Sequence, residues 1–155
     1  MGAGNGSLVS TVLKEYGEAT RAVLFQYLPD EEPRKYLYDL LSDYPRRGGR
    51  SFRPSLCIAT ARAFGCPLEA VLRTGVSIEL MHNAMLIHDD IEDDDLYRYG
   101  RETLHRQYGL GAAINVGDHL IGLGYRLISS IRAEAGAEAA ADISDRMAAA
   151  HIKLC

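Results

Sequence analysis

Apolar residues recur along most of this chain at spacings of three and four residues, which is the period of an α-helix. The alternation of apolar and polar residues that marks a half-buried strand is nearly absent. Residues 96–109 are mixed and polar, and they predict a short helix inside a loop. The pattern as a whole predicts an all-α fold, with helices over residues 7–28, 33–44, 54–64, 68–93, 111–133 and 137–154.

Proline and glycine mark the ends of these predicted helices. Pro29 ends the first, Pro33 suits the first turn of the second, and Pro45 is expected to end the second. Residues 65–67, Gly-Cys-Pro, form a helix stop followed by a new start, and Gly136 separates the last two helices. The longest uninterrupted helical pattern is therefore the one between the Gly-Cys-Pro stop and the polar segment that follows it.

Composition is that of one folded globular domain. The chain has 155 residues, of which 47% are hydrophobic and 25% charged, and both values are ordinary for folded proteins. No internal repeat or linker is visible, so we predict a single domain over residues 1–155. The net charge of −4 disfavours nucleic acid as a partner. Charge is clustered, with six carboxylates in residues 89–95 and five arginines in residues 34–53.

Signals for a membrane or a secretory pathway are missing from the pattern. No apolar run approaches the roughly 18–20 residues of a membrane-spanning helix, so no integral membrane segment is expected. The N-terminus lacks the basic start and apolar stretch of a secretory signal. Cys57, Cys66 and Cys155 are odd in number and form no Cys-x-x-Cys pair, which argues against a disulfide framework or a zinc site. We therefore expect reduced thiols and a cytoplasmic location.

An acidic run, HDDIEDDD at residues 88–95, closes an apolar helical pattern instead of standing in a polar loop. At about 100° per residue, Asp93 lies about 40° from Asp89 around the helix, with Asp90 adjacent. Carboxylates packed together are unfavourable unless a cation neutralises them. Oxygen ligands of this kind suit Mg²⁺, which also takes water and phosphate oxygens. The spacing therefore favours a magnesium site on Asp89 and Asp93.

Several basic groups accompany these carboxylates. His82 precedes Asp89 by seven residues and lies about 20° from it on the same helical face. Arg50 and Arg53 stand in a Gly-Gly-Arg-Ser-Phe-Arg-Pro segment at a helix start, where free backbone and guanidinium groups can bind phosphate oxygens. The alternative for this segment is a solvated basic turn. Arg98 is a further cation near the carboxylates, and its alternative role is an ion pair that offsets them.

These segments form an ordered series of motifs. They read GGRSFRP at residues 48–54, ELMH at 79–82, HDDIED at 88–93, RYGRETLH at 98–105 and GD at 117–118. In order and spacing the series resembles the trans-type polyprenyl diphosphate synthases, which carry GGKxxRP, ELxH, HDDxxD, RRGxPTLH and GD. The resemblance covers roughly residues 44–127 well and the flanks weakly. It implies an all-helical bundle of the isoprenoid synthase type around a deep cavity.

The resemblance also implies an activity and roles for residues. The implied reaction condenses an allylic prenyl diphosphate with isopentenyl diphosphate through magnesium-assisted ionisation. The catalytic carboxylates would be Asp89, Asp90 and Asp93, of which Asp89 and Asp93 bind the metal. Arg98 would contact the allylic diphosphate. The residues implied to hold isopentenyl diphosphate are Arg50, Arg53 and His82.

Product length and assembly are implied in the same way. The residues four and five before the first Asp of the motif, Met85 and Ala84, would line the growing prenyl tail. Periodicity by itself places Met85 directly below Asp89 and Ala84 about 140° away, so the weight on Ala84 comes from the resemblance. The family's helices at 111–133 and 137–154 pair two subunits, which implies a homodimer.

Three departures from the family pattern matter. Tyr99 stands where the family has a second arginine that grips isopentenyl diphosphate, and losing a charge-assisted hydrogen bond costs about 1.5–3 kcal/mol. Glu102 replaces a proline of the same motif. Family members are roughly twice as long, and nothing in residues 125–155 supplies their second Asp-rich motif. We therefore expect the N-terminal part of a polyprenyl synthase fold, inactive by itself.

Other functions stay open at this point. Because Tyr99 weakens the isopentenyl diphosphate site, one alternative is a terpene synthase that ionises an allylic diphosphate without condensation. Another is a non-catalytic subunit of a heteromeric prenyl synthase. A phosphohydrolase built on the His88-Asp89 pair ranks last, because it needs a metal-binding histidine well upstream and only His82 precedes His88.

Overall fold

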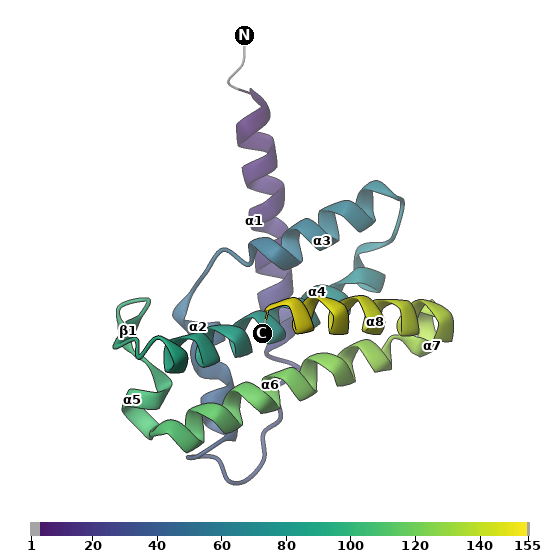
Figure 1. Cartoon of the computed structure of the whole chain (residues 1–155). Coiled ribbons are helices and arrows are strands. Elements are labelled where there is room, and N and C mark those ends of the chain that lie inside the picture. The colour runs from purple at the N-terminus through teal and green to yellow at the C-terminus, as the bar shows by residue number, and fades with distance from the viewer. Residues whose placement is uncertain (1–3, 155) are drawn as a thin grey trace.

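A computed structural model describes residues 4–154, with side chains from residue 8 onward. Cys155 and residues 1–3 lie outside the described part. Most of the described chain is helical, which confirms the predicted all-α class (Figure 1). The elements in chain order are α1 (Gly4–Leu24), the 3₁₀ helix η1 (Tyr38–Ser42), α2 (Asp43–Arg47), α3 (Phe52–Ala63), α4 (Leu68–Glu92), β1 (Tyr97–Arg98), β2 (Arg101–Glu102), α5 (Leu104–Tyr108), α6 (Leu110–Ser130), α7 (Arg132–Ala135) and α8 (Ala137–Leu154).

The core lies between the two long helices α4 and α6, which form the most extensive contact in the fold. Apolar side chains of both helices are buried there, together with side chains from α1, η1, α2 and α5. The helices approach closely at Gly124, where an added Cβ would come 2.9 Å from Met81 Cγ. The Ser77 hydroxyl donates to the Gly124 carbonyl over 2.7 Å. A residue without a side chain at this crossing thus lets the helix backbones meet.

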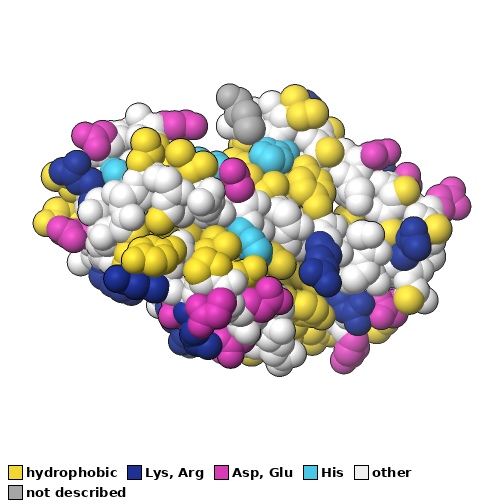
Figure 2. Space-filling view, turned by 90° about the horizontal axis from the view of Figure 1, so that it is seen from below, with side chains coloured by type: hydrophobic (Ala, Val, Ile, Leu, Met, Phe, Trp, Pro, Cys, Tyr) yellow, Lys and Arg dark blue, Asp and Glu magenta, His cyan; other side chains and the backbone are white. Residues whose placement is uncertain are grey.

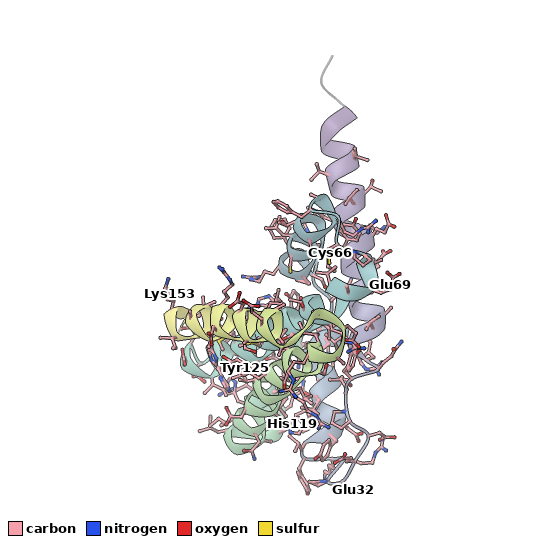
Figure 3. The ribbon with its side chains drawn as sticks, turned by 90° about the vertical axis from the view of Figure 1, so that its right-hand side faces the viewer. Glu32, Cys66, Glu69, His119, Tyr125 and Lys153 are labelled. Carbon is pink, nitrogen blue, oxygen red and sulfur yellow. The ribbon has the colours of Figure 1, made fainter. Side chains whose placement is uncertain are left out.

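The remaining helices surround this pair. α1 and α3 pack against each other and against α4, and α1 extends away from the body of the molecule (Figure 1). α8 runs beside α6, as the side view also shows (Figure 3). Tyr125 on α6 lies at this boundary, and its ring stacks on His151 of α8 with centroids 6.3 Å apart. α8 therefore covers one side of the α4–α6 pair.

The second predicted helix is wrong in its extent. Residues 33–37 form turns, η1 follows, and Pro45 lies inside the first turn of α2 instead of ending a helix. A proline is tolerated there because the first-turn N–H groups have no intrahelical partner in any case. The sequence pattern therefore identified helical propensity here but placed the break at the wrong residue.

A short hairpin replaces part of the polar segment before α5. β1 and β2 pair antiparallel, with Tyr97 opposite Glu102 and Arg98 opposite Arg101. The turn residues Tyr99 and Gly100 both have positive φ, 53° and 76°, as a tight two-residue hairpin requires. Strands of two residues are too short to show any period, so the sequence pattern gave no sign of them. The predicted short helix corresponds to α5.

No helix in the described part of the chain is both long and apolar enough to cross a membrane.

Candidate functional site

The acidic run lies at the C-terminal end of α4, where its carboxylates point in different directions. Asp89 and Asp93 are exposed and one helical turn apart, and the Asp93 N–H donates to the Asp89 carbonyl over 2.9 Å. Asp90 is fully buried. The Tyr44 hydroxyl donates to Asp90 Oδ2, and the Arg98 guanidinium donates to Asp90 Oδ1. Asp89 and Asp93 are thus exposed on successive turns of α4, whereas Asp90 is buried against Tyr44 and Arg98.

Arg98 belongs to the hairpin that follows the acidic run, and its guanidinium lies among the carboxylates of that run. Its Nε donates to Asp90 Oδ1 over 2.7 Å, and its Nη2 lies 3.2 Å from Asp89 Oδ2 and 3.3 Å from Asp95 Oδ2. The hydrogen bonds to Asp90 raise the pKa of Arg98 above its ordinary value, against the opposing effect of burial. Arg98 therefore bridges the buried carboxylate and the exposed edge of the acidic run.

Asp89 and Asp93 fit a shared magnesium ion. Among the residues whose side chains are described, no three His, Cys, Asp or Glu groups converge as they would around a fully protein-bound metal. Mg²⁺ in phosphate-handling sites takes one or two carboxylates and completes its shell with water and phosphate oxygens. Two exposed carboxylates on one helical face supply that number, since Asp90 is occupied by Tyr44 and Arg98.

The basic segment between α2 and α3 has a backbone that only glycine adopts readily. Gly48 and Gly49 have φ of 120° and 118°, and Ser51 follows in the left-handed region. The Arg21 guanidinium of α1 donates to the Gly49 carbonyl over 2.5 Å. The Ser51 hydroxyl donates to Glu79 Oε1 over 3.0 Å. The loop is thus fixed from α1 and from α4.

Glu79 is a buried carboxyl beneath this loop. Burial raises its pKa, while the hydrogen bond from Ser51 and the charges of Arg21 and Arg53 oppose the rise. Its Oε2 is buried without a hydrogen-bond partner. Sequence reasoning did not single out Arg21 or Glu79 as part of the site. Glu79 did have a sign in the sequence, because it opens the ELMH motif at residues 79–82, whereas Arg21 lies in none of the motifs.

His82 and Arg53 meet across α3 and α4. Arg53 Nη1 lies 3.1 Å from His82 Nε2. Because arginine has donors only, the imidazole nitrogen accepts this bond and the ring is neutral there. Burial, followed by the charges of Arg53 and Arg98, lowers the pKa of His82 from its ordinary value of 6.5 to about 4.

A cavity of about 520 Å³ joins several predicted residues. Arg53, His82 and Asp89 line it together with Met85. Arg50, Arg98 and Asp93 are not among its lining residues, and Ala84 is fully buried in the core between α4 and α6. The full lining comprises Arg53, Ile78, Met81, His82, Met85, Leu86, His88, Asp89, Glu92, Met147, Ala150, His151 and Leu154.

The wall contributed by α8 was missed by sequence reasoning. Met147, Ala150, His151 and Leu154 follow the i, i+3, i+4, i+7 spacing of one helical face. That spacing was visible in the sequence. The sequence did not show what this face of the helix contacts, because any packed helix has the same spacing.

Tyr99, which replaces the second arginine of the family's motif, lies beside the basic segment. A Cβ added to Gly49 would come 3.6 Å from its hydroxyl oxygen. The side chain is about half exposed. The hairpin turn therefore brings a neutral hydroxyl to the edge of the loop that carries Arg50.

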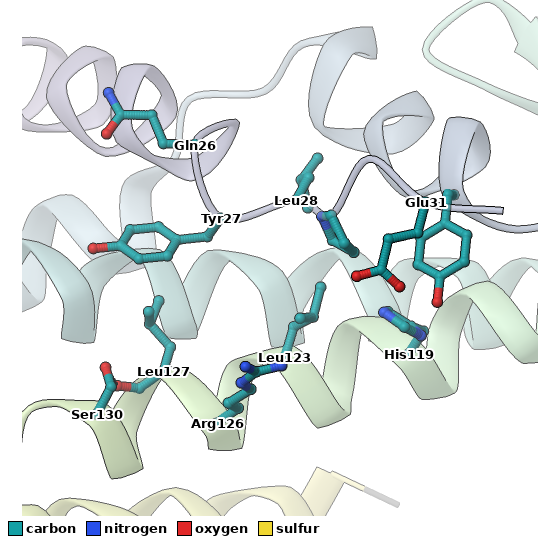
Figure 4. A pocket seen from close by; sticks show the side chains of 11 residues that line it. Gln26, Tyr27, Leu28, Glu31, His119, Leu123, Arg126, Leu127 and Ser130 are labelled. Carbon is teal, nitrogen blue, oxygen red and sulfur yellow. Dashed lines mark hydrogen bonds between the residues drawn. The ribbon is translucent and has the colours of Figure 1, made fainter. Parts of the chain in front are cut away.

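A second cavity of about 510 Å³ lies between α6 and the segment after α1 (Figure 4). Tyr38 and His119 meet there edge to face, with ring centroids 5.4 Å apart, and Arg126 lies on its rim. None of the predicted site residues lines it. The cavity beside α8 is therefore the one that gathers the predicted chemistry.

The fold is thus all-α, with two exposed carboxylates at the end of a long helix and a cavity that Asp89 and Arg53 both line. The family model described as polyprenyl synthetase matches residues 34–153. The chain belongs to this polyprenyl synthetase family.

Individual relatives agree with that assignment. The chain is 30% identical over 122 residues to a geranylgeranyl pyrophosphate synthase of Geoglobus acetivorans, a match that covers 79% of this chain and 38% of the relative. It is 33% identical over 125 residues to a farnesyl diphosphate synthase of Geobacillus stearothermophilus, covering 79% of this chain and 42% of the relative. The chain thus spans about two fifths of these proteins.

Solved structures give the same result for the fold. The geranylgeranyl pyrophosphate synthetase of Pyrococcus horikoshii matches with a TM-score of 0.74 at 32% identity, over 81% of this chain and 38% of that one. This likeness confirms the isoprenoid synthase type of fold. The relatives are named as diphosphate synthases, and the terpene synthase alternative is not favoured.

Proposed function

We propose that this chain serves a prenyltransferase that condenses an allylic prenyl diphosphate with isopentenyl diphosphate, using Mg²⁺. The observation that carries the proposal is the single cavity in which Asp89, Arg53 and His82 stand beside the apolar side chain of Met85. A prenyl diphosphate has the same two parts, an anionic head and an apolar tail. The names of the relatives support this substrate class.

In this proposal the acidic residues bind the metal and the basic residues bind the diphosphate groups. Asp89 and Asp93 would hold the metal, which when bound neutralises the departing diphosphate. Arg98, whose Nη2 lies 3.2 Å from Asp89 Oδ2, would orient the allylic diphosphate through its Nη groups. Arg50, Arg53 and His82 would hold isopentenyl diphosphate, with His82 neutral and accepting from Arg53. Met85 would contact the prenyl tail.

A homodimer through α6 is part of the proposal. Leu110 and Ile114 are exposed there, and Gly111 and Gly122 have open space around them. Seen from below, hydrophobic side chains show at several places across the face, interspersed with charged ones (Figure 2). Exposed apolar side chains such as Leu110 and Ile114 suit contact with a second copy, because buried apolar area is typical of the centre of an interface.

A cytoplasmic setting is also proposed. Cys57 and Cys66 are free thiols in the structure, and burial raises the pKa of Cys57, which keeps it protonated and unreactive. Reduced thiols of this kind suit a reducing compartment.

We propose the whole reaction only for a complete protein of the kind that the relatives represent. We expect residues 1–155 by themselves to form no detectable prenyl product, because this part of the fold cannot by itself enclose an ionising substrate and exclude water. Turnover of isopentenyl diphosphate with dimethylallyl or geranyl diphosphate by this chain alone would contradict that expectation.

The metal site is tested by calorimetric titration of Mg²⁺ in the presence and absence of a non-ionising allylic thiolodiphosphate. We expect magnesium binding to require the diphosphate and to fall at least tenfold in Asp89→Ala and in Asp93→Ala, since each removes one of two protein ligands. Asp142→Ala, an exposed carboxylate on α8, is the matched control and should bind as the wild type does. Equal binding by all four proteins would refute the proposed site.

A further inference from the structure

Asp90 is the least expected member of the acidic run, because a carboxylate without solvent contact is unfavourable unless its oxygens are paired. Both oxygens are paired here, each by a different element. Tyr44 of α2 donates to Oδ2, and Arg98 of the hairpin donates through Nε and Nη2 to Oδ1. A cation could reach Asp90 only by displacing Tyr44 or Arg98.

The backbone of the hairpin is fixed from α2 as well. Arg47 Nη1 lies 3.3 Å from the carbonyl oxygens of Arg98 and of Arg101. The buried Arg47 side chain pairs with Asp43 over 2.8 Å, and Asp43 also pairs with Arg101 over 3.1 Å. α2 therefore holds the main chain that carries Arg98.

Arg47 contacts both the hairpin backbone and the ring of Tyr44. The Arg47 guanidinium lies 4.4 Å from the centroid of the Tyr44 ring, a cation–π contact. The Tyr44 ring is buried, and only its hydroxyl reaches Asp90. Burial and the bond to Asp90 raise the pKa of Tyr44, so the hydroxyl stays protonated and remains a donor.

We propose that Tyr44 and Asp90 are positioning residues, which hold the Arg98 guanidinium beside Asp89 at the exposed edge of the acidic run. The proposal rests on the proposed function, which gives Arg98 its diphosphate. Nη2 of Arg98 already reaches 3.2 Å from Asp89. If Asp89 bound a cation, that Nη group would be free to bind diphosphate oxygens, and the bonds to Asp90 would hold the guanidinium in place.

A double-mutant cycle tests this arrangement with inorganic pyrophosphate and Mg²⁺ as the probe. Tyr44→Phe keeps the ring and removes only the hydroxyl, and Arg98→Lys removes the fork that binds Asp90. We expect Tyr44→Phe to weaken pyrophosphate binding about tenfold in the wild type and less than twofold in Arg98→Lys, a coupling of about 1.0–1.4 kcal/mol. Leu41→Val, a buried apolar neighbour of α2, is the control for lost stability and should not couple to Arg98.

A second measurement needs no ligand. The Arg98 Nε–H resonance should be protected from hydrogen exchange in the wild type, and its exchange should quicken at least tenfold in Tyr44→Phe and Asp90→Asn but not in Leu41→Val. Equal pyrophosphate losses in both backgrounds, or exchange unchanged in Tyr44→Phe, would overturn the positioning role. If the wild type binds no magnesium pyrophosphate while the Nε–H response is as expected, the positioning stands and the proposed function fails.

Discussion

The neutral state of His82 is a property of its surroundings rather than of the residue. In the unfolded chain its pKa takes the ordinary value of 6.5, and in the folded chain burial and two neighbouring guanidinium groups lower it to about 4. Protonation would put a third positive charge beside Arg53 and Arg98. The ring is thus kept as an acceptor, which fixes the direction of the Arg53 side chain.

This residue predicts a pH dependence of stability. Because the folded pKa lies below the unfolded one, the contribution is full above about pH 6.5 and is lost as the pH falls through 4. We expect a loss on the order of 1–3 kcal/mol from this group. His82→Gln keeps an acceptor without titrating, so thermal unfolding measured from pH 7 to pH 4.5 should fall less steeply in the variant.

The control for this measurement is His105→Gln, which removes a histidine of α5 and keeps His82. Its stability should follow the wild-type pH profile in the range where His82 titrates. Parallel profiles for His82→Gln and the wild type would show that His82 does not titrate as described.

At the scale of elements, the contact between α4 and α6 depends on which glycines face it. A Cβ at Gly117 would collide with the His88 imidazole of α4, whereas a Cβ at Gly122 would meet nothing within 4 Å. Both glycines lie inside the same helix. They therefore form a matched pair that separates helix propensity from packing.

We expect Gly117→Ala to lower the free energy of unfolding by about 1–3 kcal/mol, because His88 must move. Gly122→Ala should raise it by up to about 1 kcal/mol through helix propensity alone. Denaturant unfolding at low protein concentration measures both. Changes of the same sign and size in the two variants would rule out the close contact at His88.

Met85 and Ala84, four and five residues before Asp89 on α4, make a second matched pair. Met85 lines the cavity beside α8, and Ala84 is fully buried in the core. Ala84→Phe should overpack the core and cost about 1–3 kcal/mol or more of stability, whereas Met85→Phe should cost less than about 1.5 kcal/mol. In a complete enzyme we expect a product longer than farnesyl diphosphate, since flexible Met85 leaves room for the tail.

Product analysis of the complete enzyme checks this arrangement. Met85→Phe should shorten the product. An unchanged product with Met85→Phe, or a shortened one only with Ala84→Phe at wild-type stability, would show that the tail lies on the other side of α4.

At the scale of the whole molecule, the exposed apolar side chains of α6 predict self-association. We expect a dimer by light scattering at tens of micromolar protein, and a monomer for Ile114→Asp with unchanged helical content. Phe64→Ser, which removes an 88% exposed aromatic at the end of α3, should leave the dimer intact. A monomeric wild type, or dissociation only in Phe64→Ser, would locate the interface elsewhere.

The sequence by itself determined the class of the fold and the parts of the site that lie within one helix. The helical period already set Asp89 and Asp93 on one face, with His82 two turns before them, and α4 was predicted to within a residue of its observed bounds. Spacing along a helix is a local property, because each turn repeats the geometry of the last. The resemblance then added the family, which the comparisons confirm.

Only the tertiary structure decided which carboxylate is buried and what lies opposite each residue. Asp90 meets Tyr44 across 46 residues of chain, and Arg21 meets Gly49 across 28, and neither pairing leaves a trace in the local pattern. The break near Pro45 and the hairpin at Tyr99 likewise depend on contacts with distant elements. Local periodicity shows which residues share a face of a helix, but packing between elements decides the partner of each side chain.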